Sequence, residues 1–373
     1  VTVETADELL PEWFNGVRIA GVTAGASTPA SIIEEVCKKM SEIREEEMSD
    51  MGTQIGKWAG HNLDAIGSAI TGVLDLAHVA HITIGTNLMS LVGKALYNGS
   101  GKNMPLWTPA LPKSIHSKTI TEAKEYGQVH GLKGLSDKRV VYFPSCLNQR
   151  LGVTHNDTKQ AKKHGHEAQP TINDMVELLN KAGYEVIFPK NMKKLCCGMI
   201  WESKGMPDIA DRKTAELEKA LLEASENGKY PVLCDQSPCL HRMRDHISSM
   251  HLYEPAEFIY EFLAPNLEFT PIEETVAVHV TCSSRRMGLA DKIIALARMC
   301  SRNVVVPSEV GCCGFAGDKG FMMPELNKYA LRKLRPQIEA SGATHGYSNS
   351  RTCEIGLTTN SGIPYKSIAY LVD

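Results

Sequence analysis

The triplets Cys196-Cys197-Gly198 and Cys312-Cys313-Gly314 stand at matching points of a duplicated pattern. Each triplet has one cysteine upstream, after an apolar run, and one downstream, in a polar turn. The upstream cysteines are Cys146 and Cys282, and the downstream ones are Cys239 and Cys353. Two sets of four thiols are the supply that two iron–sulfur clusters need, because four thiolates hold each cluster. The pattern therefore predicts an electron-carrying protein.

Bulk composition places the chain among globular proteins with a sizeable core. It has 373 residues, 43% of them hydrophobic, which suggests two or three domains. A net charge of −3 demands neither nucleic acid nor an anionic membrane as a partner. Residues 1–5 lack the basic and apolar regions of a secretory signal, so we expect a reducing, cytoplasmic setting. There, 11 cysteines favour metal or redox chemistry over disulfides.

Alternatives exist for the cysteines. Structural zinc or plain thiols would also use such residues, although zinc sites usually show close Cys-x2-4-Cys pairs. Cys37 and Cys300 lie on amphipathic helical patterns and are expected to be inert, buried thiols. Cys234 has no counterpart in the second half of the pattern, where Ser348 is near the equivalent position, so we expect a packed thiol there too.

Composition and hydrophobic pattern divide the chain into five predicted segments. A short α/β tail is expected first, with a strand-like run at 17–22 and a helix at 30–44 that Ser27 or Thr28 can cap. Polar residues interrupt the apolar stretch 65–92, which favours a buried or interfacial helix pair over a membrane span. The segments are the tail at 1–46, a helical segment at 49–98, a connecting arm at 99–138, and two lobes at 139–265 and 266–373.

From Arg139 onward, strand-like apolar runs alternate with helical patterns. This alternation predicts an α/β fold in two similar, pseudo-repeated lobes with mostly parallel sheets, preceded by the helical segment. The runs are 140–143, 184–188, 231–233, 276–280, 304–306 and 344–347, and the helices between them include 172–182, 208–227, 289–301 and 325–340.

Several cysteines follow strand ends, where ligand sites of α/β sheets collect and helix N-termini point. Helix dipoles and nearby cations lower a thiol's pKa, and the thiolate is the form that binds metal. The glycine after each Cys-Cys pair leaves room for a turn or a close approach. The basic residues expected to offset cluster charge are Arg150, Arg242, Arg285, Arg286, Lys319 and Arg351.

These motifs resemble a known family over about residues 49–373. The repeated cysteine set is similar to the CCG domain of heterodisulfide reductase B-type subunits, glycolate oxidase iron–sulfur subunits and lactate-utilisation proteins. It most strongly resembles the C-terminal half of FAD- and iron–sulfur-dependent D-lactate dehydrogenases of the FAD-linked oxidase family. The words that carry the resemblance are Phe143-Pro144-Ser145-Cys146, Leu195-Cys196-Cys197-Gly198-Met199, Cys234-Asp235-Gln236-Ser237-Pro238-Cys239, Val280-Thr281-Cys282-Ser283-Ser284-Arg285, Gly311-Cys312-Cys313-Gly314-Phe315-Ala316-Gly317-Asp318 and Gly346-Tyr347-Ser348-Asn349-Ser350-Arg351-Thr352-Cys353-Glu354.

The resemblance implies an oxidoreductase that passes electrons from a flavin toward a quinone or another acceptor. It implies two [4Fe-4S] clusters, with no catalytic acid or base. The FAD and the D-lactate site would lie on a missing domain or a partner, and the chain would be cytoplasmic or peripheral at the inner membrane face. The implied ligands are Cys146, Cys196, Cys197, Cys239, Cys282, Cys312, Cys313 and Cys353.

One departure from the general CCG pattern bears on the chemistry. That pattern ends in Cys-x-x-Cys and supplies five cysteines per set, as in the non-cubane clusters of heterodisulfide reductases. Here Gln236 and Ser350 occupy the earlier position. Four thiols per set indicate ordinary cubane clusters and make disulfide cleavage doubtful.

Residues 1–46 resemble a different family, the C-terminal end of 4-hydroxy-3-methylbut-2-enyl diphosphate reductase. The matching words are Glu4-Thr5-Ala6-Asp7, Pro11-Glu12-Trp13 and Gly21-Val22-Thr23-Ala24-Gly25-Ala26-Ser27-Thr28-Pro29. The resemblance implies a diphosphate-binding role for Ser27, although the remainder of that family's site is absent. We interpret the segment as a remnant or a fusion piece.

Other classes of function stay open. His78 and His81 lie three residues apart and would suit a haem or a quinone, but packed or surface histidines are more common. His155, His164 and His166 are expected in a solvated, Lys-rich loop. The rival functions are a thiol or metal-binding protein without clusters, a fragment related to the diphosphate reductase, and a non-enzymatic docking remnant.

Overall fold

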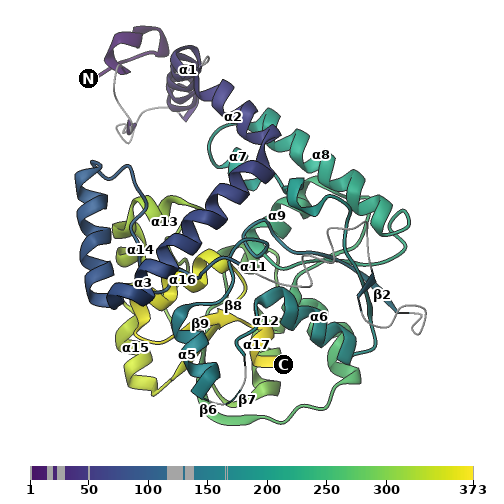
Figure 1. Cartoon of the computed structure of the whole chain (residues 1–373). Coiled ribbons are helices and arrows are strands. Elements are labelled where there is room, and N and C mark those ends of the chain that lie inside the picture. Colours follow the sequence, from purple (N-terminus) through teal and green to yellow (C-terminus); the bar gives the residue numbers. More distant parts are fainter. Residues whose placement is uncertain are drawn as a thin grey trace. The chain divides into compact units, whose positions relative to one another are not determined.

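The computed structural model describes residues 2–14, 20–22, 30–48, 51–115, 129–130, 138–163, 165 and 167–372 (Figure 1). Contacts between residues divide the chain into two compact units, Val1–His61 and Asn62–Asp373. The predicted lobes and both sets of cysteines lie within the second unit, which therefore holds everything needed for the site.

The first unit is helical where it is described. It contains η1 (Ala6–Glu8), η2 (Pro11–Phe14), α1 (Ala30–Met48) and α2 (Met51–His61). In α1 the buried positions are Val36 and Ile43, which pack with Leu9. Cys37 points away from this face and is exposed, so the expectation of a buried thiol is wrong for it. Residues 20–22 of the expected strand have no regular structure, and Ser27 lies outside the described residues.

Helix α3 (Leu63–Gly99) opens the second unit. The backbone of Gly85 is non-helical, with a φ of 79°, so α3 consists of two helical pieces, as the expected pair requires. Its buried residues Gly67, Leu74 and His81 recur every seven residues, while many of its apolar side chains are exposed. By length and composition α3 could cross a membrane, and its most apolar stretch is only 17% buried.

The first lobe is built on a five-stranded sheet in the order β1-β3-β2-β4-β5. All neighbours are parallel except β1, which runs antiparallel to β3. The strands are β1 (Val129–His130), β2 (Arg139–Phe143), β3 (Glu185–Ile187), β4 (Val232–Cys234) and β5 (Leu252–Tyr253). The helical elements are α5 (His155–Lys163), α6 (Thr171–Lys181), η3 (Met192–Lys194), α7 (Met199–Glu202), α8 (Pro207–Ala224), α9 (Ser237–His246), α10 (Pro255–Phe258), η4 (Ile259–Leu263) and η5 (Ala264–Asn266).

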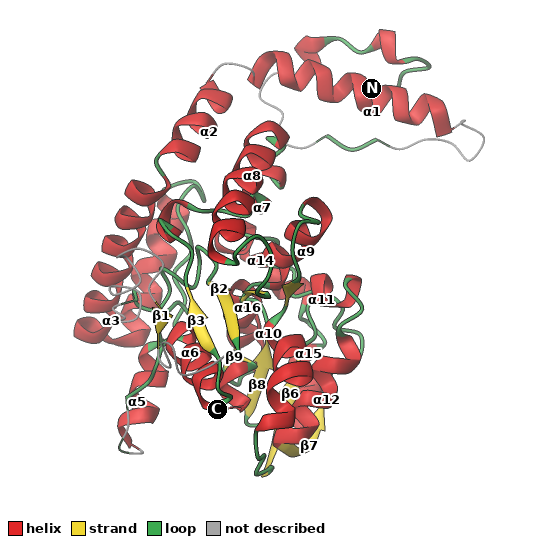
Figure 2. Cartoon of the chain, turned by 90° about the vertical axis from the view of Figure 1, so that its right-hand side faces the viewer, coloured by secondary structure: helices red, strands yellow, loops and turns green. Residues whose placement is uncertain are grey.

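The second lobe repeats this order in an all-parallel sheet, β7-β6-β8-β9. In both lobes the first parallel strand lies between the second and the third, as a duplication predicts. Figure 2 shows this order for β6, β7 and β8 of the second lobe. The strands are β6 (Ile272–Val278), β7 (Ser301–Val305), β8 (His345–Ser348) and β9 (Tyr365–Ser367). The helices are α11 (Cys282–Arg286), α12 (Ala290–Cys300), α13 (Lys319–Met322), α14 (Pro324–Ala330), α15 (Leu334–Ser341), α16 (Arg351–Ser361) and α17 (Ala369–Val372).

The expected helix at 325–340 is wrong in one respect, because two helices, α14 and α15, replace it. Pro336 lacks the N–H that a continuous helix would need, and it is tolerated only because it lies in the first turn of α15. The remaining helices of the alternating pattern agree with the sequence within a few residues.

The core explains why the strands are so apolar. Val140, Val141 and Tyr142 of β2 are completely buried, since helices cover both faces of a parallel sheet. One continuous core cluster joins residues of β2, β4 and β6 and includes Ile368 and Ala369 near the C-terminus. The α/β class and the mostly parallel sheets are therefore confirmed.

Candidate functional site

The first set of cysteines lies beyond the carboxyl ends of three neighbouring strands. Cys146 is in the turn after β2, and Cys239 is in the first turn of α9 after β4. Cys196 and Cys197 lie between η3 and α7, after β3. Because β3, β2 and β4 are adjacent and parallel, their carboxyl ends meet at one edge of the sheet and bring the four thiols together.

The second set repeats this placement. Cys282 begins α11 after β6, and Cys353 lies in the first turn of α16 after β8. Cys312 and Cys313 lie in the segment between β7 and α13. The strands β7, β6 and β8 are adjacent and parallel, so the same topological rule gathers these thiols.

Within each set, neighbouring thiols are hydrogen-bonded in a row. The first row runs Cys146, Cys196, Cys197, Cys239. The second runs Cys282, Cys312, Cys313, Cys353, with 2.9 Å between the Sγ atoms of Cys313 and Cys353. The structure thus brings all eight predicted residues into two quartets, and their role as cluster ligands stays a prediction.

One thiol in each row favours the thiolate form. Hydrogen bonds from Cys146 and Cys197 hold the pKa of Cys196 well below its usual range. In the second row, hydrogen bonds from Cys282 and Cys313 do the same for the pKa of Cys312. These two residues are the first cysteines of their triplets, so the duplicated sequence has produced a duplicated electrostatic arrangement.

The glycine of each triplet donates to that same thiolate. The Gly198 N–H donates to Cys196 Sγ at 3.4 Å, and the Gly314 N–H donates to Cys312 Sγ at 3.3 Å. Both glycines have a positive φ, 89° and 72°, which aims their N–H groups back at the sulfur. Hydrogen bonds of this kind to sulfur tune the potential of iron–sulfur clusters.

The donor set fits a cluster better than a single ion. Among the described residues, no three His, Cys, Asp or Glu side chains are arranged to hold one metal ion. A zinc ion needs four ligands at about 2.0–2.3 Å from one centre. A four-iron cluster instead takes one thiolate at each of its four irons, and each quartet supplies four thiols beside one sheet edge.

Three of the six cations expected to offset cluster charge have carboxylate partners. Arg242 is buried between Glu202 and Asp211, with 2.6 Å to each carboxylate, and its Nε donates to the Cys197 carbonyl. Arg150 pairs with Asp64 and Arg351 with Glu354. The first-lobe cations therefore act mainly as structural links, a role that charge counting from sequence did not predict.

Two buried residues, Gln236 and Ser350, hold the lobes together at the site, a contact that their sequence positions alone did not predict. Gln236 Nε2 donates to Ser350 Oγ at 3.0 Å, and the Arg351 N–H donates to Gln236 Oε1 at 2.8 Å. Gln236 and Ser350 occupy the two positions where the general pattern has a fifth cysteine. Their matching offsets in the two repeats were the available signal, since equivalent positions in a pseudo-symmetric pair often meet at the axis.

Another overlooked residue is Asp235, which shapes the turn that carries Cys146. Its carboxylate accepts hydrogen bonds from the Ser145 N–H and from the Tyr142 hydroxyl, both at 2.7 Å. Burial raises the pKa of Asp235, and these donors oppose the rise. Cys234, next to it, is completely buried, and burial raises the pKa of its thiol. That environment supports the interpretation of Cys234 as a packed thiol.

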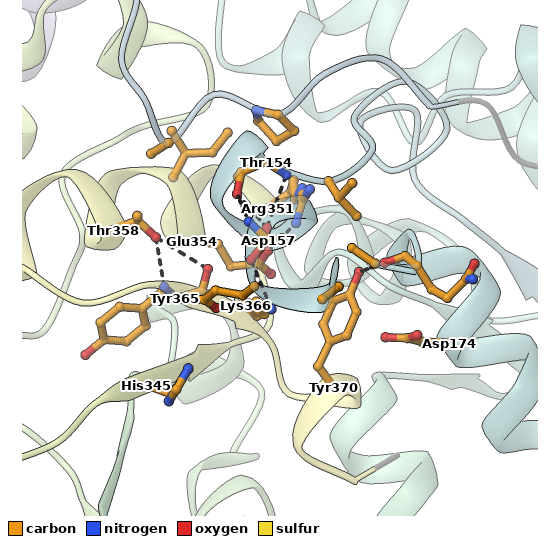
Figure 3. Close-up of a pocket in the computed structure, with 18 of the residues that line it drawn as sticks. Thr154, Asp157, Asp174, His345, Arg351, Glu354, Thr358, Tyr365, Lys366 and Tyr370 are labelled. Atoms are coloured by element: carbon orange, nitrogen blue, oxygen red, sulfur yellow. Dashed lines mark hydrogen bonds and ion pairs between the residues drawn. The ribbon is translucent and has the colours of Figure 1, made fainter. Parts of the chain in front are cut away.

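A cavity of about 500 Å³ lies between the two lobes (Figure 3). It is lined from both lobes, by α5 and α6 and by β9, α16 and α17. Two ion pairs meet there, Asp157 with Lys366 at 3.0 Å and Arg351 with Glu354 at 2.9 Å. Burial raises the pKa of Glu354 to about 7. Cavities of this size between lobes are typical of small-molecule sites.

The histidines are mainly packing residues. His81 is buried, its Nε2 lies 2.9 Å from Thr86 Oγ1, and its ring contacts Trp107 and His155. His155 begins α5, so the expectation that it lies in a loop is wrong, while His164 and His166 lie outside the described residues. Burial lowers the pKa of His78, His81 and His155.

Comparison with known proteins agrees with the cysteine geometry. The family model described as CCG, cysteine-rich domain, matches residues 140–244 and 276–358, just over half of the chain. Lactate utilization protein A 1 from Bacillus mycoides is 28% identical over 189 residues, which are 46% of this chain and 74% of that protein. A solved aspartate racemase homologue from Pyrococcus horikoshii is 12% identical with a TM-score of 0.26, covering 63% of this chain and 95% of that one, a likeness too low for structural argument.

The first residues match a second family. The LytB protein model matches residues 1–41. The 4-hydroxy-3-methylbut-2-enyl diphosphate reductase of Aquifex aeolicus is 58% identical over 43 residues, and that of Geobacter metallireducens is 56% identical over 41 residues. These matches cover 12% and 11% of this chain but only 15% and 14% of the reductases, so the chain spans a small part of those proteins.

Proposed function

Because the chain belongs to the cysteine-rich CCG domain family, we propose that each thiol quartet binds a [4Fe-4S] cluster of an FAD-dependent 2-hydroxy acid dehydrogenase. The chain carries an iron–sulfur electron-transfer module of oxidoreductase type. The flavin and the D-lactate site belong, in this proposal, to another domain or a partner, and a quinone or another acceptor receives the electrons. The single observation that carries the proposal is the pair of matched quartets, each with one cysteine sulfur that accepts a hydrogen bond from a glycine N–H.

The residues of the chain supply binding and electrostatics. Clusters of this type, when bound, take up and release single electrons. The eight cysteines would hold them, Gly198 and Gly314 would donate to the ligand sulfurs, and Asp235 would keep the Cys146 turn in place. No side chain need transfer a proton, so we expect activity without a catalytic acid or base.

Anaerobic purification with full iron supply tests the proposal. We expect a brown protein with about eight iron and eight sulfide per chain and an EPR signal after reduction. The Cys196→Ser and Cys312→Ser variants should each lose about half of the iron, whereas Cys300→Ser should lose none. A colourless, folded protein with titratable thiols, or with zinc, would instead support the thiol or metal-binding alternative.

The cavity beside α16 is our candidate for the acceptor site. Arg351, Glu354 and Thr358 line it from one face of α16, while Cys353 lies on a different face of the same helix. Replacing the half-buried Ala168 by Phe should fill the cavity and raise the concentration of a water-soluble quinone needed for half-maximal reduction. The iron content should not change, and an unaltered quinone dependence would place the acceptor elsewhere.

The reductase-like segment supports only a weaker second candidate. Its match is specific but short, and Ser27 lies outside the described residues. If this segment binds diphosphate, the chain should bind an isoprenoid diphosphate and a Ser27→Ala variant should not. We favour the electron-transfer function because the matched quartets carry it independently of residues 1–61.

A further inference from the structure

The two quartets share a backbone arrangement but not their surroundings. When Cys146 is placed on Cys282, Gln149 falls on Arg285 and Phe143 falls on His279. Each change puts a charged or polar side chain in the second lobe where the first lobe has a neutral or apolar one. Because both sites lie in one chain and share a backbone arrangement, each lobe serves as a control for the effect of these side chains in the other.

Gln149 and Arg285 donate hydrogen bonds to backbone carbonyls in equivalent segments. Gln149 Nε2 donates to the carbonyls of Pro144 at 2.7 Å and Met192 at 3.4 Å. Arg285 Nε donates to the carbonyl of Val280 at 3.2 Å, the position equivalent to Pro144, and its Nη2 contacts the carbonyl of Val310 at 3.5 Å. Both side chains link the turn of the upstream cysteine to the segment before the triplet. The difference between them is therefore one full positive charge.

No carboxylate of the described chain cancels this charge. Arg285 has only backbone carbonyl partners there, whereas Arg242 in the first lobe is enclosed by Glu202 and Asp211. Lys213 of the first lobe, whose charge acts on Cys196, likewise pairs with Glu216 at 2.7 Å. The charges of Arg285 and Cys312 both act on the ring of His279, so the three residues are neighbours. The guanidinium is thus an unbalanced cation close to the second quartet.

His279 and the exposure of Cys312 act in the same direction. The His279 ring is 3% exposed, and its Nε2 has no hydrogen-bond partner in the described part of the protein. The equivalent Phe143 is 1% exposed and offers no polar atom. Cys312 is exposed, whereas the equivalent Cys196 is buried. Polar neighbours and water both stabilise added negative charge.

We propose that Arg285, helped by His279, gives the second site the higher reduction potential, so that electrons pass from the first lobe to the second and leave from there. Reduction adds one negative charge, and a nearby fixed cation stabilises the reduced form. One electron moves from the reduced first site to the oxidised second site, and no bond forms or breaks. The inference rests on the proposed function, in which a reduced flavin supplies the electron.

A redox titration of the anaerobic, cluster-containing full chain, followed by EPR, tests the order of the two potentials. Cys196→Ser and Cys312→Ser assign each signal to a lobe, because each removes one site. We expect the signal of higher potential to vanish in Cys312→Ser and to persist in Cys196→Ser. The reverse assignment would overturn the inference.

Exchanging the matched residues tests the cause. Arg285→Gln should lower the second potential alone, and Gln149→Arg should raise the first alone. We expect each to change the electron's distribution between the sites at least tenfold, about 59 mV for one electron. Arg286→Gln is the control, because it removes one positive charge at a position where the first lobe also has an arginine, Arg150. It should shift the reduction potential of the second site less than Arg285→Gln does.

The outcomes separate this inference from the proposed function. If Arg285→Gln shifts the second potential no more than Arg286→Gln does, the role of Arg285 is wrong although the clusters are present. Should Arg285→Gln fail to assemble its cluster, His279→Phe, which copies the first lobe, must lower the second potential for the inference to stand. A chain that binds no iron and sulfide would refute the proposed function itself.

Discussion

Gly198 and Gly314 show how a single backbone angle positions a sulfur ligand. Their φ angles of 89° and 72° lie in the left-handed region. A Cβ at Gly198 would collide with the Ala210 carbonyl, and one at Gly314 would lie 2.6 Å from Ala330 Cβ and 2.8 Å from the Leu326 carbonyl. These residues are therefore glycine for both conformational and steric reasons.

Gly198→Ala and Gly314→Ala should each lower the free energy of unfolding by about 1–3 kcal/mol and reduce the iron content of their own lobe. Urea unfolding and iron analysis provide the measurements. Gly311→Ala is the matched control, because a Cβ there meets nothing within 4 Å. Equal losses in all three variants would show that the collision and the backbone angle are not the cause.

Glu254 is a buried carboxyl whose state depends on pH. It caps α10 by accepting from the N–H groups of Ala256 and Glu257, and Asn349 of the second lobe also donates to it. Burial raises the pKa of Glu254 from 4.5 to about 7. The folded state then keeps its proton at pH values where the unfolded state releases it, so the contribution of Glu254 to stability is full below pH 4.5 and is lost as the pH rises through 7.

Between pH 4.5 and 7 this carboxyl should cost about 3 kcal/mol of unfolding free energy. Glu254→Gln cannot ionise, so its unfolding free energy should decline less over that window, by roughly that amount, in urea unfolding at a series of pH values. Glu177→Gln, on the exposed surface of α6, should keep the pH dependence of the natural chain. A Glu254→Gln variant with the same slope would contradict the prediction.

Helix α3 presents its apolar residues outward. Two of its acidic groups are used on the protein side, since Asp64 pairs with Arg150 and Asp75 accepts from Ser114. Val73 is 66% exposed and Leu76 is 71% exposed. A large exposed apolar face marks a docking surface, and its sparse charge, with Lys94 as an exposed basic residue, favours a lipid surface. From this feature we propose that α3 attaches the chain peripherally to a membrane, for which the sequence suggested the inner membrane face.

The chain should float with phosphatidylcholine vesicles in a density gradient, with or without anionic lipid. A Val73→Gln/Leu76→Gln variant should float less, because two apolar side chains leave the lipid contact. Tyr329→Gln is the control, as Tyr329 is equally exposed, at 68%, on α14. Absence of flotation together with self-association that the double variant loses would identify a protein partner instead.

The lobes meet through buried polar contacts as well as through the core. Gln236 and Ser350 bond across the interface, and Ser237 Oγ lies 2.7 Å from Thr281 Oγ1. These contacts hold α9 of the first lobe to the start of α16 and α11 of the second. The two quartets therefore lie on elements that cannot separate without breaking buried hydrogen bonds. These bonds keep the distance between the two quartets constant.

A double-mutant cycle on Gln236→Ala and Ser350→Ala should give a coupling of about 1 kcal/mol in unfolding free energy. The physical reason is that either substitution leaves the other polar group buried without its partner. Gln236→Ala combined with Ser68→Ala on α3 should be additive. Additivity of the interface pair would mean that the observed bond does not stabilise the lobe contact.

Local patterns in the sequence were enough for much of the fold and the outline of the site. Alternating apolar runs predicted the α/β lobes, because backbone periodicity is a local property, and the repeated cysteine words predicted which eight thiols would gather. The break before α15 was missed although Pro336 signalled it. The exposure of Cys37 was missed because a helix with few apolar residues leaves open which face is buried.

Contacts between distant residues decided the rest. Only the folded chain reveals that Arg242 is neutralised by Glu202 and Asp211 while Arg285 has no carboxylate partner in the described residues, or that Gln236 reaches Ser350. Ion pairing and burial depend on groups that lie far apart in sequence, so no local pattern encodes them. Thus the order of residues by itself determined two thiol quartets on twin sheets, and tertiary packing determined the charge around each.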